Sequence, residues 1–329
     1  MEIVQFYTEM IKIGKDLDFA KDMLDNGGLV AIPTETVYGL GGNALNIDTI
    51  DKIFKLKKRP SNDPLICHTN SLSKIKRYVK QIPDKAYKLS EKFWPGPLTL
   101  VFEKKDLIPN KTTSNLNTVA FRIPDKEITL KLLSSLDYPL SAPSANKFGY
   151  ISPITTDHVY KNFDDGIDYI LDGGRCELGI ESTIIGFENN KTIVYRLGSL
   201  ITEDIEKCVG EIALYSKKEN FPGSFKSHYS PQKKLYLGDI EILANKYQNK
   251  RIGILCFDQY YDFVKEENQI ILSKKSSLIE ASKNLYSSLY KLDNMKNIDI
   301  ILTTFVEDTL IGKTINNRLL KSAENDEKY

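Results

Sequence analysis

The sequence predicts an α/β protein in two parts, a larger domain around a mixed sheet and a smaller, doubly wound domain. The first observation is length, because 329 residues suffice for about two domains with their own cores. The second is that short apolar runs alternate with amphipathic segments along most of the chain. The third is a polar stretch, rich in proline and aromatic residues, that interrupts this alternation. We therefore expect a domain at 1–210, a linker at 211–234 and a domain at 235–329.

Eight apolar runs predict the strands of the larger part. They are 29–32, 65–68, 98–102, 119–123, 139–142, 169–171, 182–187 and 192–197. Gly27 and Gly28 end a helix before the first run, since glycine accepts the left-handed conformation at a helix end. Asp48 can cap a helix that turns Ile50 and Ile53 inward. This many strands with helices between them favours a large, twisted mixed sheet.

The smaller part shows strict alternation. Strands are expected at 235–237, 252–257, 270–272 and 298–303, with helices at 240–247 and 314–323 and a long helix between the last two strands. Leucines 278, 285, 289 and 292 form one stripe on that long helix, which is typical of core packing. The alternation predicts a small Rossmann-like domain.

Composition limits the possible functions. The 45 Lys and Arg against 44 Asp and Glu leave a net charge of +1, which argues against broad binding of nucleic acid but allows a local basic cluster. Four dispersed cysteines and three histidines offer no zinc-ligand spacing, so we expect no protein-ligated metal. No stretch approaches the about 18 apolar residues of a membrane span, and we expect a cytoplasmic protein without a membrane partner.

Two common nucleotide signatures are missing. Gly312-Lys313-Thr314 resembles the end of a P-loop, but Glu307 stands where that loop requires glycine. The smaller part also has no Gly-x-Gly-x-x-Gly turn after its first strand, so its pattern gives no reason to expect NAD. An ATP site must therefore lie elsewhere in the chain.

Several predicted strands of the larger part end in hydroxyl-bearing and small residues. Residues 33–44, 141–146 and 179–183 have this composition, which suits a ligand that approaches the backbone but also suits plain glycine-rich turns. Lys57 and Arg59 follow a helix, where they could bind a polyphosphate or form a solvated helix end.

Two arginines lie inside apolar strands. Arg122 and Arg196 are costly there unless paired. For Arg122 the partner could be a protein carboxylate or a ligand carboxylate. Together with the polar strand ends, the arginines favour a cleft for a polyanion and a small zwitterion rather than a hydrolase site.

These segments resemble the YrdC-like threonylcarbamoyl-AMP synthases in their long, two-domain form. The matching motifs of the larger part are Pro33 to Ala44, Lys57-x-Arg59 through Pro64-Leu65, Trp94 to Thr99, Arg122-Ile123-Pro124, Ser141 to Asn146 and Glu181-Ser182-Thr183. His228 to Pro231, Asn284-Leu285-Tyr286 and Asn317-Arg318-Leu319 resemble the added C-terminal part of the long form. The resemblance implies a YrdC-like twisted sheet followed by a smaller domain.

The resemblance also implies a reaction. L-threonine, bicarbonate and ATP, the last with Mg²⁺, give L-threonylcarbamoyl-AMP and pyrophosphate, which is a nucleotidyltransferase activity. A separate transferase complex then modifies the tRNA adenosine next to the anticodon, and transient contact with that complex is expected. Stable binding of nucleic acid is not expected.

Residue roles follow from the same resemblance. Lys57 and Arg59 would be the catalytic pair on the triphosphate. Further nucleotide contacts would come from Thr118, Ala142, Ser144, Ser152, Arg196 and Tyr229, with Tyr229 folding over the occupied cleft. Threonine would be framed by Thr36, His68, Arg122 and Ser182, with Arg122 on its carboxylate. Asp63 stands where the family usually has Asn, so its role stays open, and no residue is expected to bind the metal directly.

Two other functions fit parts of the pattern. A non-catalytic module for double-stranded RNA or tRNA would also use a basic cleft, and its binding would fall steeply with salt. A carbamoyl-phosphate-dependent adenylate former would carry acylphosphatase-like and zinc-finger parts, which this chain lacks.

Overall fold

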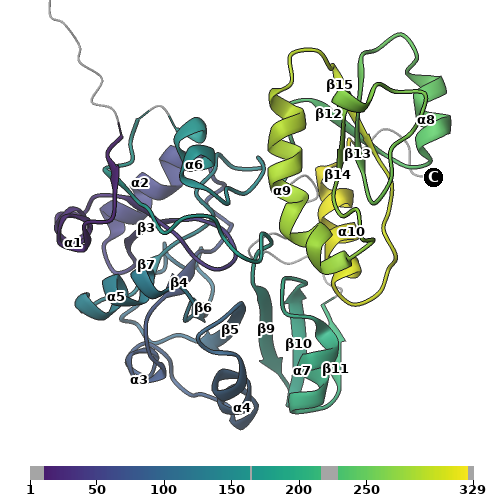
Figure 1. Cartoon of the computed structure of the whole chain (residues 1–329). Helices are drawn as coiled ribbons and strands as arrows, with labels where there is room; N and C mark the ends of the chain where they lie inside the picture. Colours follow the sequence, from purple (N-terminus) through teal and green to yellow (C-terminus); the bar gives the residue numbers. More distant parts are fainter. Residues whose placement is uncertain (1–10, 164, 216–228, 325–329) are drawn as a thin grey trace, which may run out of the picture.

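The computed structural model describes residues 11–163, 165–215 and 229–324, and these fold into a large mixed sheet and a small parallel sheet (Figure 1). The strands of the large sheet are β1 (Ile13–Gly14), β2 (Val30–Ile32), β3 (Gly39–Asn43), β4 (Ile66–His68), β5 (Leu98–Glu103), β6 (Thr118–Arg122), β7 (Leu140–Ser141), β8 (Tyr169–Leu171), β9 (Thr183–Glu188), β10 (Lys191–Arg196) and β11 (Ile212–Leu214). The helices of this part are α1 (Leu17–Asp25), α2 (Ile47–Lys57), α3 (Leu72–Ile75), α4 (Asp84–Phe93), α5 (Glu127–Ser135), α6 (Thr156–Asn162) and α7 (Thr202–Val209).

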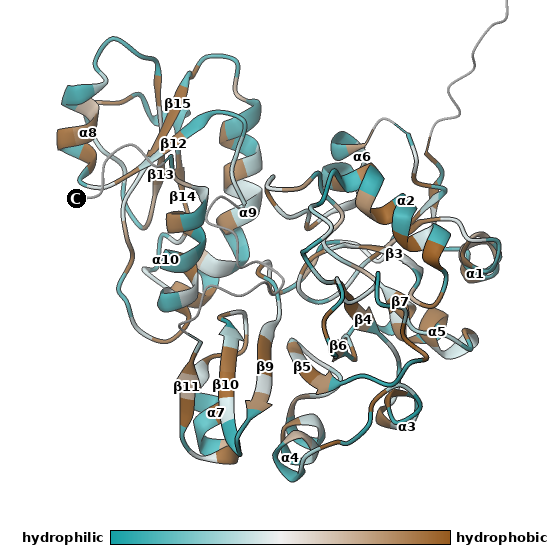
Figure 2. Cartoon of the chain, turned by 180° about the vertical axis from the view of Figure 1, so that it is seen from behind, coloured by the Kyte–Doolittle hydropathy of each residue, from teal (hydrophilic) through white to brown (hydrophobic). Residues whose placement is uncertain are grey.

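The large sheet has the order β1-β8-β2-β3-β7-β4-β6-β5-β9-β10-β11. Its pairings are mixed: β4 and β6 run parallel, as do β5 and β9, whereas β7 is antiparallel to β4 and β5 to β6. Figure 2 shows brown, hydrophobic stretches along β10 and β11. As the sequence predicts, this is a large mixed sheet with helices.

The small part contains β12 (Lys234–Leu237), α8 (Ile240–Lys246), β13 (Ile252–Cys256), a short 3₁₀ helix (Glu266–Asn268), β14 (Gln269–Ile271), α9 (Leu278–Asn294), β15 (Ile300–Thr303) and α10 (Ile311–Ser322). Its four strands are all parallel, in the order β12-β15-β13-β14. Helix α9 lies on the side of this sheet that faces the large part, and α8 lies on the far side (Figure 1). The expected Rossmann-like arrangement is confirmed.

Three strands were not predicted, and each has a physical reason. β1 has only two residues. β3 is Gly39-Leu40-Gly41-Gly42-Asn43, a composition that reads as a turn. Gly42 is needed because α2 packs on this strand: a Cβ on Gly42 would lie 2.6 Å from Cγ2 of Thr49. β11 pairs parallel with β10 although it lies in the expected linker, of which residues 216–228 fall outside the described chain.

Helix α2 differs from expectation at both ends. Its N-cap is Asn46, whose side chain accepts from the backbone N–H groups of Asp48 and Thr49, so the predicted cap at Asp48 was wrong. The helix ends at Lys57 because Lys58 adopts the left-handed conformation, with φ 52°. That turn sends Lys57 and Arg59 in different directions.

A continuous hydrophobic cluster joins the two parts. It includes Ile151 and Ile154 from the larger part and Leu285, Leu289 and Leu292 from α9. The predicted leucine stripe is therefore core packing, and part of that core is shared between the two parts. In the described ranges, no helix combines the length and hydrophobicity needed to span a membrane.

Candidate functional site

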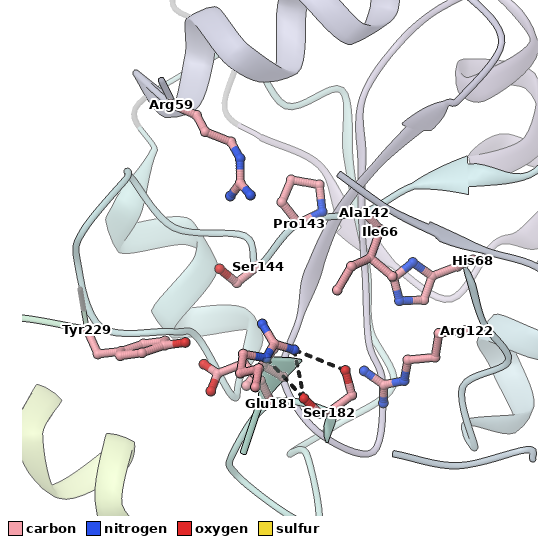
Figure 3. Close-up of a pocket in the computed structure, with 12 residues that line it drawn as sticks. Arg59, Ile66, His68, Arg122, Ala142, Pro143, Ser144, Glu181, Ser182 and Tyr229 are labelled. Atoms are coloured by element: carbon pink, nitrogen blue, oxygen red, sulfur yellow. Dashed lines mark hydrogen bonds between the residues drawn. The ribbon is translucent and has the colours of Figure 1, made fainter. Parts of the chain in front are cut away.

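One pocket collects most of the predicted site residues (Figure 3). Its lining is Val37, Arg59, Ile66, His68, Arg122, Ala142, Pro143, Ser144, Glu181, Ser182, Arg196 and Tyr229. Eight of these were predicted from the sequence, and they come from strand ends, loops and the connection between the two parts. The enclosed space between these side chains is about 50 Å³.

Arg59 enters the pocket from the end of α2 and is held by the loop that follows. Its Nε donates to the Asp63 carbonyl at 3.0 Å and Nη2 donates to the Pro64 carbonyl at 3.0 Å. Nη2 also lies 2.8 Å from Oδ1 of Asp63, and both side chains are almost fully buried. Burial raises the pKa of the Asp63 carboxyl in spite of Arg59, and burial lowers the pKa of Arg59. Arg59 is thus oriented before any substrate binds.

Lys57 does not line the pocket. It is 1% exposed, and its Nζ donates to the backbone carbonyls of Ser144 and Asn146, each at 2.5 Å. Burial, and then the charge of Arg59, lower its pKa well below the ordinary value. The expected fan of Lys57 and Arg59 onto one polyphosphate is not the arrangement seen here. Lys57 instead holds the 144–146 loop in place through these two hydrogen bonds.

Arg122, at the end of β6, forms a buried ion pair with Glu35. Its Nη2 lies 2.7 Å from Oε1 of Glu35, and its Nε donates to the Gly96 carbonyl at 3.3 Å. Glu35 Oε2 also accepts from the backbone N–H of Asp125 at 3.0 Å. Of the two partners left open for Arg122, the protein carboxylate is therefore present. Glu35 was part of a recognised motif, but nothing in its spacing indicates this contact.

His68, on β4, lies beside Arg122 and is 3% exposed. Burial and the neighbouring Arg122 lower its pKa to about 3, so the imidazole is neutral at physiological pH. Its Nδ1 is buried and has no hydrogen-bond partner among the residues that the structure describes. A neutral imidazole with an unused nitrogen in a pocket suits a ligand's hydroxyl or amino group.

Arg196 and Ser182 both line the pocket and form a hydrogen-bonded unit, and Figure 3 shows Ser182 next to Arg122. Arg196 donates from Nε and Nη2 to the Ser182 carbonyl at 3.1 and 2.8 Å, and from Nη2 to Ser182 Oγ at 3.0 Å. Ser182 Oγ also lies 2.7 Å from Oγ1 of Thr99. Burial lowers the pKa of Arg196. These contacts fix the guanidinium at the pocket wall.

Three further predicted residues lie outside the lining. Thr36 is fully buried, with its Oγ1 2.8 Å from Oγ1 of Thr34. Thr118 is the first residue of β6, at the opposite end from Arg122. Ser152 is fully buried and donates to Oε1 of Glu181 at 2.6 Å.

Glu181 lines the pocket but received no role from the sequence. Burial alone would raise its pKa, but Arg318 and then Arg196 lower it to about 2, so the carboxylate is ionised. Arg318 comes from α10 of the small part, 137 residues away in sequence. Over residues 11–163, 165–215 and 229–324, no group of three or more His, Cys, Asp or Glu could hold a metal ion.

Comparison with known proteins identifies the family. Residues 22–198 match the Sua5_yciO_yrdC model, described as "Telomere recombination", and residues 201–324 match the C-terminal domain of threonylcarbamoyl-AMP synthase. The threonylcarbamoyl-AMP synthase of Pyrococcus abyssi is 36% identical over 98% of both chains, and that of Bacillus subtilis is 35% identical over 92% of both. The crystal structure of P. abyssi Sua5 complexed with L-threonine superposes with a TM-score of 0.88 at 35% identity, covering 95% of this chain and 97% of that one. On this evidence of sequence and fold, the chain belongs to the threonylcarbamoyl-AMP synthase family.

Proposed function

We propose that this chain makes L-threonylcarbamoyl-AMP from L-threonine, bicarbonate and ATP and releases pyrophosphate. One observation carries the proposal: a single pocket gathers Arg59, Arg122 and Arg196 in a chain that matches threonylcarbamoyl-AMP synthases over nearly its whole length. Three guanidinium groups in one buried pocket suit substrates that carry a triphosphate and a carboxylate. L-threonine in the crystal structure of the P. abyssi relative supports threonine as one substrate.

On the threonine side, Arg122 binds the substrate carboxylate while Glu35 fixes the orientation of its guanidinium. Arginine has five N–H donors, so its contacts with Glu35 and Gly96 leave donors for a second carboxylate. His68 Nδ1 and Ser182 Oγ lie at the same pocket and can bind the amino and hydroxyl groups. Thr36 supports the 34–37 turn from inside the protein.

On the nucleotide side, Arg59 and Arg196 neutralise phosphate charge, and Ala142 and Ser144 contact the nucleotide. Lys57 acts by holding the Ser144 loop. Mg²⁺ bound to ATP would neutralise part of the phosphate charge. The residues that the structure describes offer no direct ligands for the metal, because Asp63 is paired with Arg59 and Glu181 with Arg318, and they hold no acidic cluster. The phosphates of ATP would therefore carry the Mg²⁺ into the pocket.

The chemistry needs no strong general base. The amine of threonine adds to carbon dioxide derived from bicarbonate, and the proton released passes to solvent. A carbamate oxygen then bonds to the α-phosphorus of ATP, and the bond to the pyrophosphate oxygen breaks with its electron pair. Positioning and charge neutralisation provide most of the acceleration in such reactions, and the buried arginines supply both. Enclosure also protects the carbamate and the mixed anhydride from water.

The product is consumed by a separate transferase that modifies tRNA, so we propose transient contact with that complex and a cytoplasmic site of action.

To test the activity, purified protein is incubated with ATP, Mg²⁺, bicarbonate and labelled threonine. Pyrophosphate release must depend on both threonine and bicarbonate, and labelled threonylcarbamoyl-AMP must form. Pyrophosphate release that does not depend on threonine, or does not depend on bicarbonate, contradicts the proposal. Tight, salt-sensitive tRNA binding without turnover would favour the RNA-binding alternative.

A further inference from the structure

The wall of the pocket at Glu181 is completed by the small part of the chain. Glu181 Oε1 accepts from Ser152 Oγ at 2.6 Å, and the hydroxyl of Tyr286 lies 2.9 and 3.0 Å from the two carboxylate oxygens. Arg318 donates from Nε to Oε2 at 2.9 Å. Tyr286 belongs to α9 and Arg318 to α10, so two helices of the small part hold a residue that lines the pocket.

Arg318 is itself fixed by the larger part. Its Nη2 donates to the Leu197 carbonyl at 2.7 Å, and its side chain is fully buried. One turn earlier on α10, Thr314 Oγ1 donates to the Gly198 carbonyl at 3.0 Å. The Arg318 guanidinium carbon also lies 4.8 Å from the ring centre of Tyr229, another lining residue. Helix α10 therefore docks on Leu197 and Gly198, which directly follow β10, the strand that ends with Arg196.

The charges explain why this contact matters. An ionised carboxylate in a pocket for phosphates repels them, and it attracts any nearby arginine. Arg318 is the residue that pairs with Glu181, whereas Arg196 donates to Ser182 and, within the described parts of the chain, forms no ion pair with a carboxylate. Without Arg318, the basic residues Arg196 and Lys321 still act on Glu181. Of these two, Arg196 lines the pocket, so its pairing with Glu181 would remove one positive charge from the substrate side.

We propose that Arg318 is a positioning residue of the active site, which neutralises Glu181 from the small part and so leaves Arg196 available for an anionic group of the substrate. This rests on the proposed function, and it gives the small part a direct role in the active site. It also predicts that the need for Arg318 depends on the charge of Glu181.

The test compares full-length wild type with R318M, E181Q and the double variant E181Q/R318M. KM for ATP and kcat are measured by pyrophosphate release, and ATP binding is measured by calorimetry. R318M should raise KM for ATP about tenfold with a smaller change in kcat, because ground-state binding is lost. The double variant should recover most of that loss. It still lacks the bond to the Leu197 carbonyl, so recovery isolates the effect of charge.

Lys313→Gln is the matched control, because Lys313 also joins α10 to the larger part but does so through a partly exposed ion pair with Glu203, away from the pocket. Its KM should equal that of wild type. An unchanged KM in R318M, or a double variant as impaired as R318M, overturns the inference. If R318M does not fold, Arg318→Lys decides: it keeps the charge and must keep KM within about threefold of wild type. Wild type that binds ATP but makes no product contradicts the proposed function instead, while calorimetry on the variants still tests the inference.

Discussion

Arg122, which lines the pocket, forms an ion pair with Glu35 at 2.7 Å, with less than a tenth of either side chain exposed. The arginine proposed for the threonine carboxylate is therefore held in place by a carboxylate of the protein. Breaking a buried pair by removing one partner leaves the other charge uncompensated. Stability and substrate binding at Arg122 can thus be separated by mutation.

Arg122→Met should lower the free energy of unfolding by about 3–5 kcal/mol, because Glu35 stays buried and unpaired. E35Q/R122M should regain much of that stability but none of the threonine binding. Urea unfolding and calorimetry with threonine measure the two effects. Threonine binding by either variant would show that Arg122 does not hold the substrate carboxylate.

Asp63→Asn tests how the protein controls the charge of Arg59. The substitution keeps the backbone carbonyls of residues 63 and 64 that orient Arg59, but it removes the carboxylate 2.8 Å from Nη2. The pocket gains positive charge toward the triphosphate, so KM for ATP should fall about threefold or more. A higher KM in D63N, at unchanged protein stability, would mean that the carboxylate helps ATP to bind. Asp106→Asn, at an exposed position, is a charge-matched control.

Much of the fold was predictable because it depends on local patterns. The run Tyr169–Leu171 was placed correctly since all three residues are buried, and the alternation of the small part gave its parallel sheet. Strand β3 was not predicted because its glycines allow close packing with other segments, such as that of Gly42 with α2, which the local sequence does not show. The same limit applies to β11, a short strand with two exposed residues that follows a helix.

The site residues also divide into those that the sequence indicated and those that depend on contacts between distant segments. Arg122 stood out because an arginine is costly inside an apolar strand, whereas Arg59 and Ser182 were assigned through motifs that resemble the family, and the structure brings all three to one pocket. Partners could not be predicted, because they depend on contacts between distant segments. Lys57 meets carbonyls 87 and 89 positions away, and Glu181 meets Arg318 from the other part of the chain. The Asp63 contact with Arg59 is only four positions apart, but it depends on the left-handed turn at Lys58.

Lys57→Met tests the supporting role of Lys57. The variant loses the two hydrogen bonds that the buried Nζ of Lys57 donates to the Ser144 and Asn146 carbonyls. The free energy of unfolding should fall by about 1–3 kcal/mol, because two buried carbonyls lose their donor. Turnover should fall because Ser144 moves. An ATP concentration series then distinguishes the roles. A loss confined to KM, with stability unchanged, would place Lys57 on the phosphates instead.

The pH dependence of stability should report on His68. Its folded-state pKa is lowered to about 3 by burial and by Arg122, whereas the unfolded chain takes up a proton near the ordinary value of 6.5. Below pH 6.5 the unfolded state therefore binds the extra proton, and stability falls as the pH is lowered toward 3. Between pH 7 and 5 this amounts to about 2 kcal/mol for one such group. Between pH 7 and 5, the free energy of unfolding of His68→Gln should fall by about 2 kcal/mol less than that of wild type. Urea unfolding at both pH values measures this difference.

His158, whose pKa is lowered to about 4 by burial, adds a similar contribution, and His158→Gln therefore serves as a comparison. Because His68 lies in the pocket and His158 packs on Tyr290 of α9, bound threonine should change the pH dependence only where His68 is present. An equal effect of threonine on both variants would mean that His68 does not face the substrate.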